Sequence, residues 1–294
     1  MKMKIALITV VTFMFVCCFL FIIGCNRTEE TEKTEATYIK TTVAVTVLPQ
    51  KAFAEAVCGN LAEVITMVPP GNSPGNYEPT PVEMESFSKA AIYFTIGVPT
   101  EKANILPKAN KMKIVDLNTK VAAKYPDREF SAGSRDPHIW LSPKRAKVMV
   151  ETIAQEMSII DQKNAETYQK NALDYLNKLD QLDREIKAMF EGLTNKKFIV
   201  FHPAYGYLAD DYGLTMYALE QNGKEATPQH LQEMIKLAKA ENIKVIFSQA
   251  EIDSKQPQAF AEEIGGTKEM IDPLSADYIT NLQTMTKAIS RAMK

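Results

Sequence analysis

The sequence predicts an α/β protein with two lobes of mainly parallel sheet, joined by a single long rigid helix. From residue 41 onward, short β-rich segments alternate with helical patterns, which is typical of βαβ units. The alternation occurs in two blocks, which we take as an N-terminal lobe (38–143) and a C-terminal lobe (195–294). The segment between them, 144–194, is helical in pattern and contains the connecting helix.

The N-terminal lobe begins a regular series of strands and helices. Strands are expected at residues 42–47, 64–68, 91–96 and 113–117, and helices at 51–57 and 81–89. The second helix has a well-defined start, because Thr80 suits the N-cap, Pro81 the first helical position and Glu83 the acid of a capping box. This order places consecutive strands in parallel, with helices as crossovers.

The connecting helix is predicted at residues 165–190. Apolar residues recur there at intervals of three and four, from Tyr168 to Phe190, with charged residues between them. At 1.5 Å per residue the helix would be about 39 Å long, enough to run along both lobes. A coiled coil would need heptads sustained over a longer stretch, so a helical spine is the better interpretation.

The C-terminal lobe repeats the alternation. Strands are expected at 198–201, 215–218, 244–248 and 269–271, and helices at 228–241, 256–264 and 276–293. Thr227 followed by Pro228 is a common helix start. The ends of these strands are of interest because ligands of open α/β sheets collect beyond the carboxyl ends of the strands.

The N-terminus carries the pattern of an export signal. Lys2 and Lys4 precede an apolar run at 5–24, which ends in Gly24. Gly24 is the small residue that a signal peptide requires before its cleavage site. The segment resembles a bacterial lipobox, which implies that residues 1–24 are removed and that Cys25 is lipidated. An uncleaved anchor helix is the alternative. Residues 25–37 would then form the lipidated end and a flexible tether, and the protein would be extracytoplasmic, in a periplasm or on the outer face of the cell membrane.

Composition excludes several other classes. The chain has 294 residues and is 46% hydrophobic, so it can build a core. Its formal net charge of -2 provides no basic surface for nucleic acid. The four cysteines, at 17, 18, 25 and 58, do not form a disulfide framework or a zinc-binding cysteine cluster, and Cys58 is expected to pack as a small apolar residue.

Three side chains stand out as candidate metal ligands: His138, His202 and Asp272. His138 lies between Pro137 and Pro143, and His202 and Asp272 each follow a predicted strand. Two imidazoles and a carboxylate suit zinc or a harder first-row ion. The wide spacing excludes a local finger motif and implies a site assembled between the lobes. Taken alone, a histidine in such a proline-bounded turn is more often a surface hydrogen-bonding residue than a metal ligand, and His230 is interpreted as an exposed residue of a helix.

These motifs together resemble one family, the metal-receptor lipoproteins (cluster A-I substrate-binding proteins) that supply zinc or manganese to ABC importers. The resemblance runs from about residue 42 to the C-terminus. It rests on the segments Pro69-Pro70-Gly71, Tyr77-Glu78-Pro79-Thr80-Pro81, Asp136-Pro137-His138 with Trp140-Leu141, Phe201-His202-Pro203-Ala204-Tyr205-Gly206-Tyr207 and Asp272-Pro273-Leu274. It implies one divalent ion in the cleft between two lobes, with His138, His202 and Asp272 as the second, third and fourth ligands.

The first ligand position of the family is occupied by Gly75, which has no side chain. Water, Asn76 or Glu78 could fill that position, or the site could be too weak to function. A histidine at 202 favours zinc, whereas an oxygen ligand in the first position would favour manganese or iron.

The resemblance therefore implies a monomeric, lipid-anchored binding protein, not an enzyme, that captures zinc and delivers it to an ABC permease. Two alternatives remain open from the sequence. A degenerate member could bind manganese, iron or no metal, or act as an adhesin, because Gly75 removes a ligand. A metallohydrolase is possible in principle, because two histidines, one aspartate and an open position can activate water, although beyond Glu78 no general base stands out.

Overall fold

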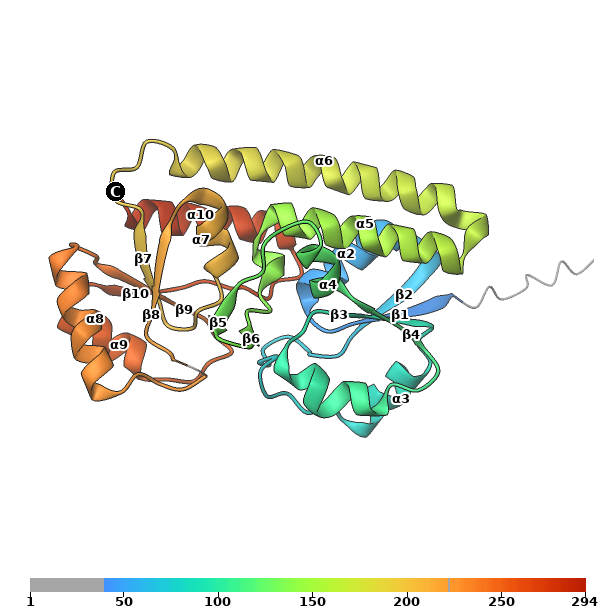
Figure 1. Cartoon of the computed structure of the whole chain (residues 1–294), viewed down its shortest axis with the longest axis horizontal. Helices are drawn as coiled ribbons and strands as arrows, with labels where there is room; N and C mark the ends of the chain where they lie inside the picture. Colours follow the sequence, from blue (N-terminus) through green and yellow to red (C-terminus); the bar gives the residue numbers. More distant parts are fainter. Residues whose placement is uncertain (1–39, 222) are drawn as a thin grey trace, which may run out of the picture. The chain divides into compact units, whose positions relative to one another are not determined.

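The computed structural model describes residues 40–221 and 223–294 (Figure 1). The predicted signal peptide, Cys25 and the tether lie outside the described residues. Within the described residues, no helix is both long enough and apolar enough to cross a membrane. Residues Lys40–Lys294 form one compact unit.

The unit contains two four-stranded parallel sheets, as the sequence predicts. The first sheet has the order β2-β1-β3-β4 and is built from β1 (Thr41–Val45), β2 (Ala62–Thr66), β3 (Ile92–Thr95) and β4 (Lys113–Asp116). The second sheet has the order β10-β9-β7-β8 and is built from β7 (Lys197–Val200), β8 (Thr215–Ala218), β9 (Val245–Ser248) and β10 (Thr267–Met270). The predicted strands differ from these bounds by at most two residues at either end.

The helices also follow the prediction closely. They are α2 (Leu48–Cys58), α3 (Pro81–Ser88), α4 (Leu117–Ala122), α5 (Pro143–Ile160), α6 (Ala165–Phe190), α7 (Gly206–Tyr212), α8 (Pro228–Ala240), α9 (Gln256–Glu263) and α10 (Tyr278–Ala292). The predicted helical spine is α6, with the expected bounds. The short helices α4 and α7 and the hairpin of β5 (Glu129–Ser131) and β6 (Ser134–Arg135) were not predicted, because each is too short to show a period.

A layer of helices connects the two lobes. Figure 1 shows α6 running beside α5 and α10, and α2 packs on both α5 and α6. Alternate strand residues face this layer: Val43 and Val45 in the first lobe and Phe198 and Val200 in the second belong to the same buried core. Each sheet therefore packs one face on a shared core, which limits how far the lobes can move relative to each other.

The opposite face of each sheet has a local core. Ala44 and Tyr93 pack beneath α3 in the first lobe, and Ile199 and Phe201 pack beneath α8 and α9 in the second. Cys58 belongs to the shared core and not to these local ones; its thiol is fully buried, as its expected packing role requires, and burial raises its pKa to about 12.

Glu101 is a buried carboxyl of the first lobe. It accepts hydrogen bonds from Thr46 Oγ1 and from the backbone N–H groups of Ile96 (2.8 Å) and Gly97 (2.7 Å). Burial outweighs these donors and raises the pKa of Glu101 to about 7. The folded state therefore holds a proton on Glu101 at pH values at which the unfolded chain has lost it.

We expect Glu101 to make the protein less stable as the pH rises. Between its ordinary pKa of 4.5 and about 7, the folded state binds the extra proton, so the free energy of unfolding falls with increasing pH. Urea unfolding at pH 5 and pH 8 should show a loss about 2.5 kcal/mol larger in the natural protein than in Glu101→Gln. Equal pH dependence in the two proteins would contradict this.

Candidate metal site

His138 and His202 lie in contact. His138 precedes the short turn η4 (Ile139–Leu141), and His202 follows β7 by two residues. Their Nε2 atoms are 3.3 Å apart, although 64 residues separate them in the chain. The structure therefore brings together the two histidines that the sequence selected.

Each imidazole is held through its Nδ1 atom by a carboxylate. His138 Nδ1 lies 2.7 Å from Oδ1 of Asp136, which also accepts the backbone N–H of His138 at 2.9 Å. His202 Nδ1 lies 3.0 Å from both carboxylate oxygens of Glu220. A carboxylate accepts a hydrogen bond from Nδ1–H, which leaves the Nε2 atom of a neutral imidazole with a free lone pair.

The two Nε2 lone pairs therefore face each other, which is unfavourable without a cation between them. Burial lowers the pKa of His138, although Asp136 opposes the shift, so this ring favours the neutral form that binds metals. Zinc–nitrogen bonds of about 2.0–2.1 Å at a tetrahedral angle place two nitrogens about 3.3 Å apart. The observed separation of 3.3 Å matches this value.

Asp272, the third predicted ligand, does not complete a metal site with this pair of histidines. Its Oδ1 accepts the backbone N–H of Leu274 at 2.7 Å, and its side chain borders a cavity of about 280 Å³. Among residues 40–221 and 223–294, no three or more His, Cys, Asp or Glu side chains are arranged so that they could hold a metal ion. The segment that follows His138 is nevertheless linked to the segment that follows Asp272, because Trp140 Nε1 donates to the carbonyl of Pro273 (2.8 Å).

Gly75 lies in an exposed part of the loop that precedes α3. Its N–H donates to Ser73 Oγ at 3.2 Å, and its backbone is not among those with positive φ. A Cβ at this position would meet Ser73 Oγ at 3.4 Å, which is ordinary contact. Asn76 and Glu78 are exposed in the same loop. A side chain can therefore be accommodated at position 75 without rearrangement of the backbone.

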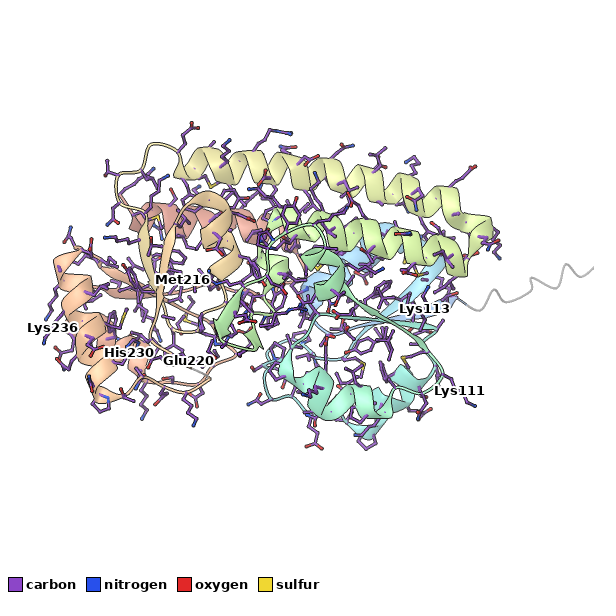
Figure 2. All side chains as sticks on the ribbon, in the orientation of Figure 1. Lys111, Lys113, Met216, Glu220, His230 and Lys236 are labelled. Carbon is purple, nitrogen blue, oxygen red and sulfur yellow. The ribbon has the colours of Figure 1, made fainter. Side chains whose placement is uncertain are left out.

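Asp136 and Glu220 are site residues that the sequence did not reveal as such. Glu220, labelled in Figure 2, follows β8 by two residues. His202 follows β7 by the same number of residues. Because β7 and β8 pair in parallel with Val200 opposite Ala218, both side chains emerge at the same level of the sheet edge. The pairing of β7 with β8 could have revealed Glu220, but a single sequence gives strand positions and not their register.

The remaining candidates have structural roles. Tyr205, Tyr207 and Tyr212, which follow His202 in the chain, are buried and pack in the core. His230 is the third residue of α8, as predicted, but it is not simply exposed: its Nε2 lies 3.2 Å from the carbonyl oxygen of Ala218. The side chain is 17% exposed.

Comparison with known proteins supports the resemblance seen in the motifs. The chain is 27% identical over 278 residues to the high-affinity zinc uptake system protein ZnuA of Bacillus subtilis, covering 89% of this chain and 87% of that protein. It is 27% identical to the zinc-binding lipoprotein AdcA of Streptococcus pneumoniae, covering 93% of this chain and 59% of AdcA. A crystal structure of a ZnuA superposes with a TM-score of 0.82 at 34% identity, covering 87% of this chain and 100% of that one. A family model matches residues 43–292. The chain belongs to the family of zinc-uptake complex component A, periplasmic (ZnuA).

Proposed function

We propose that this protein is the extracytoplasmic zinc-binding component of an ABC uptake system. It captures a zinc ion between its lobes and delivers the ion to a permease, and it does not act as an enzyme. The observation that carries the proposal is the pair of Nε2 atoms 3.3 Å apart, each on an imidazole whose Nδ1 is held by a carboxylate. This arrangement is suited to one cation of about the size of zinc.

The ligands in this proposal are His138, His202 and Asp272. Asp272 would have to leave its bond with the Leu274 N–H, or share it, to reach the ion. Its position after β10, in the same parallel sheet as β7, supports this assignment. This ligand set favours zinc, and manganese or iron could bind if further oxygen ligands complete the site.

The mode of attachment follows from the sequence. Cleavage before Cys25 and lipidation of its thiol would tether a monomer to the outer face of the cell membrane or within a periplasm. The shared helical layer supports a small lobe movement on binding, so the permease would have to recognise a modest change in loop position.

Equilibrium dialysis of the purified chain against micromolar free zinc tests the proposal. We expect about one equivalent of zinc per chain. Elemental analysis showing less than about a tenth of an equivalent of zinc, manganese and iron would remove the proposed function.

Gly75→His should retain or strengthen zinc binding. The loop has room for the new side chain, and an additional imidazole could occupy a coordination position that glycine leaves open. We expect the zinc dissociation constant to fall, by about tenfold if the imidazole reaches the ion. Competition with a chromophoric chelator measures the change. An unchanged dissociation constant in Gly75→His would show that the loop does not approach the ion, and a higher one would contradict the prediction. Gly71→His is unsuitable as a comparison because Gly71 has a positive φ of 78°.

A further inference from the structure

Arg128 pairs with the carboxylate that supports His138. Its Nε atom lies 3.6 Å from Oδ2 of Asp136, whose side chain is fully buried, while Oδ1 of the same carboxylate lies 2.7 Å from Nδ1 of His138. Among the described residues, no other lysine or arginine forms an ion pair with Asp136. A buried carboxylate is costly without a counter-charge, so the guanidinium stabilises the charge that holds the His138 ring.

The two facing atoms of this ion pair are shielded from solvent. Nε of Arg128 and Oδ2 of Asp136 are buried and have no hydrogen-bond partner among the described residues, although the Arg128 side chain as a whole is 31% exposed. Their separation of 3.6 Å is longer than a hydrogen bond, so charge attraction joins them. This attraction is strong because little water screens it, and it restricts the orientation of the carboxylate.

Arg128 is itself held from both lobes. The N–H of Asp136 donates to the carbonyl of Arg128 (2.8 Å), and the N–H of Arg128 donates to the hydroxyl of Tyr207 (3.0 Å). The same hydroxyl donates to the carbonyl of Asp136 (3.0 Å). Nη1 of Arg128 donates to both carboxylate oxygens of Asp210, each at 2.9 Å. Because Tyr207 and Asp210 lie on α7, Arg128 is fixed between that helix and Asp136.

Gly206, the first residue of α7, leaves space for the Arg128 side chain. A Cβ at position 206 would come within 3.0 Å of Nε, Cδ and Cζ of Arg128. The backbone of Gly206 is not among those with positive φ, so a left-handed conformation does not explain the glycine. The close approach of the guanidinium does explain it. The residue at position 206 therefore serves the placement of Arg128, which is an observation independent of the ion pair.

The hydrogen of a neutral His138 ring has two available acceptors. On Nδ1 the hydrogen is donated to Asp136, which leaves the Nε2 lone pair free for a cation. On Nε2 it is donated to Nε2 of His202, 3.3 Å away, which closes the histidine pair to a cation. A charged and well-held carboxylate favours the first tautomer, because hydrogen bonds to a charged acceptor are stronger than those between neutral groups.

We propose that Arg128 is a positioning residue for zinc capture: by holding Asp136, it keeps the hydrogen of His138 on Nδ1 and leaves Nε2 available for the ion. The inference rests on the proposed function, because it takes the histidine pair as the place where zinc binds. It also gives Gly206 a role, which is to admit the guanidinium. Neither Arg128 nor Gly206 is a metal ligand in this proposal.

The test compares Arg128→Met, Arg128→Lys and Gly206→Ala with the control Arg135→Met. Arg135 is an exposed arginine that pairs with Asp127, so its replacement changes the net charge equally without removing a partner of Asp136. Nitrogen NMR of the metal-free proteins at about pH 8, well above the ordinary pKa of histidine, shows which ring nitrogen carries the hydrogen. The zinc dissociation constant is measured with a chromophoric chelator, and the melting temperature is measured without metal.

We expect His138 to carry its hydrogen on Nδ1 in the natural protein and in the control. In Arg128→Met and in Gly206→Ala, the share with the hydrogen on Nε2 should rise, and zinc should bind about tenfold more weakly. Arg128→Lys should lie between these limits, because an ammonium compensates Asp136 but lacks the planar fork that also reaches Asp210. Combining Gly206→Ala with Arg128→Met should weaken binding no further, since both changes remove the same contact.

An unchanged His138 ring in Arg128→Met, or tighter zinc binding, would overturn this inference. The proposed function would stand if the natural chain binds one zinc. A lower melting temperature of Arg128→Met with an unchanged ring and unchanged zinc affinity would also overturn the inference, because that result indicates a purely structural role. Absence of zinc from the natural protein would instead overturn the proposed function. The ring spectra need no metal, so they decide the role of Arg128 in either case.

Discussion

Replacing His202 with alanine is expected to abolish most of the stabilisation that zinc gives. The variant keeps a single imidazole at the centre of the site, so the zinc dissociation constant should rise by more than about a hundredfold. At a free zinc concentration of about 1,000 times the natural dissociation constant, the natural protein gains about 4 kcal/mol, and the variant should gain about 1.4 kcal/mol or less. His138→Ala should behave in the same way, because both Nε2 atoms face the same point.

The readout is the difference in melting temperature with and without zinc for each variant. This difference is independent of any change that the substitution makes in the metal-free protein, such as the loss of the hydrogen bonds to Glu220. His230→Ala is the matched control, because His230 lies on α8 and bonds to the Ala218 carbonyl. It should retain the full zinc effect. A full zinc effect in both His138→Ala and His202→Ala would place the ion elsewhere in the protein.

Arg145→Ala should strongly destabilise the folded protein. Arg145 Nη1 lies 2.8 Å from Oδ1 of Asp211, and the two side chains are 5% and 10% exposed. The guanidinium also lies 4.4 Å from the ring centre of Tyr207. Removing the cation leaves the Asp211 charge buried and uncompensated, which costs about 3–5 kcal/mol.

This ion pair connects α5 to α7, the helix that follows the His202 loop. Urea unfolding measures the loss of stability. Lys124→Ala is the control, because the pair of Lys124 and Glu151 is 55% and 42% exposed, and its loss should cost less than about 1 kcal/mol. A loss in Arg145→Ala as small as in the control would show that water or another group compensates Asp211.

Much of the fold could be predicted because its signals are local. The amphipathic period of α6 continues over about seven turns, and Thr80 with Glu83 forms the capping box that the sequence indicates. The family assignment, the two parallel sheets and the zinc-related function are confirmed by the comparisons and the fold. The limits of the lobes and the ligand set stay predictions.

The site was less predictable because its parts are distant in the chain. Sequence reasoning selected His138 and His202 from three histidines, because one lies between prolines and the other follows a strand. It did not select Glu220, which depends on the pairing of β7 with β8. It also could not show that Asp272 would bond to the Leu274 N–H.

The sequence alone determined the type of protein: the order of strands and helices, the length of the connecting helix and the side chains able to bind a metal. These properties depend on residues that are neighbours in the chain, where periodicity and capping act. The tertiary structure decided which nitrogen of each imidazole is free and which carboxylates hold the rings. Those outcomes depend on strand register and on contacts between the lobes. Such contacts form only when segments far apart in the chain pack together, as His138 and His202 do at a sequence separation of 64.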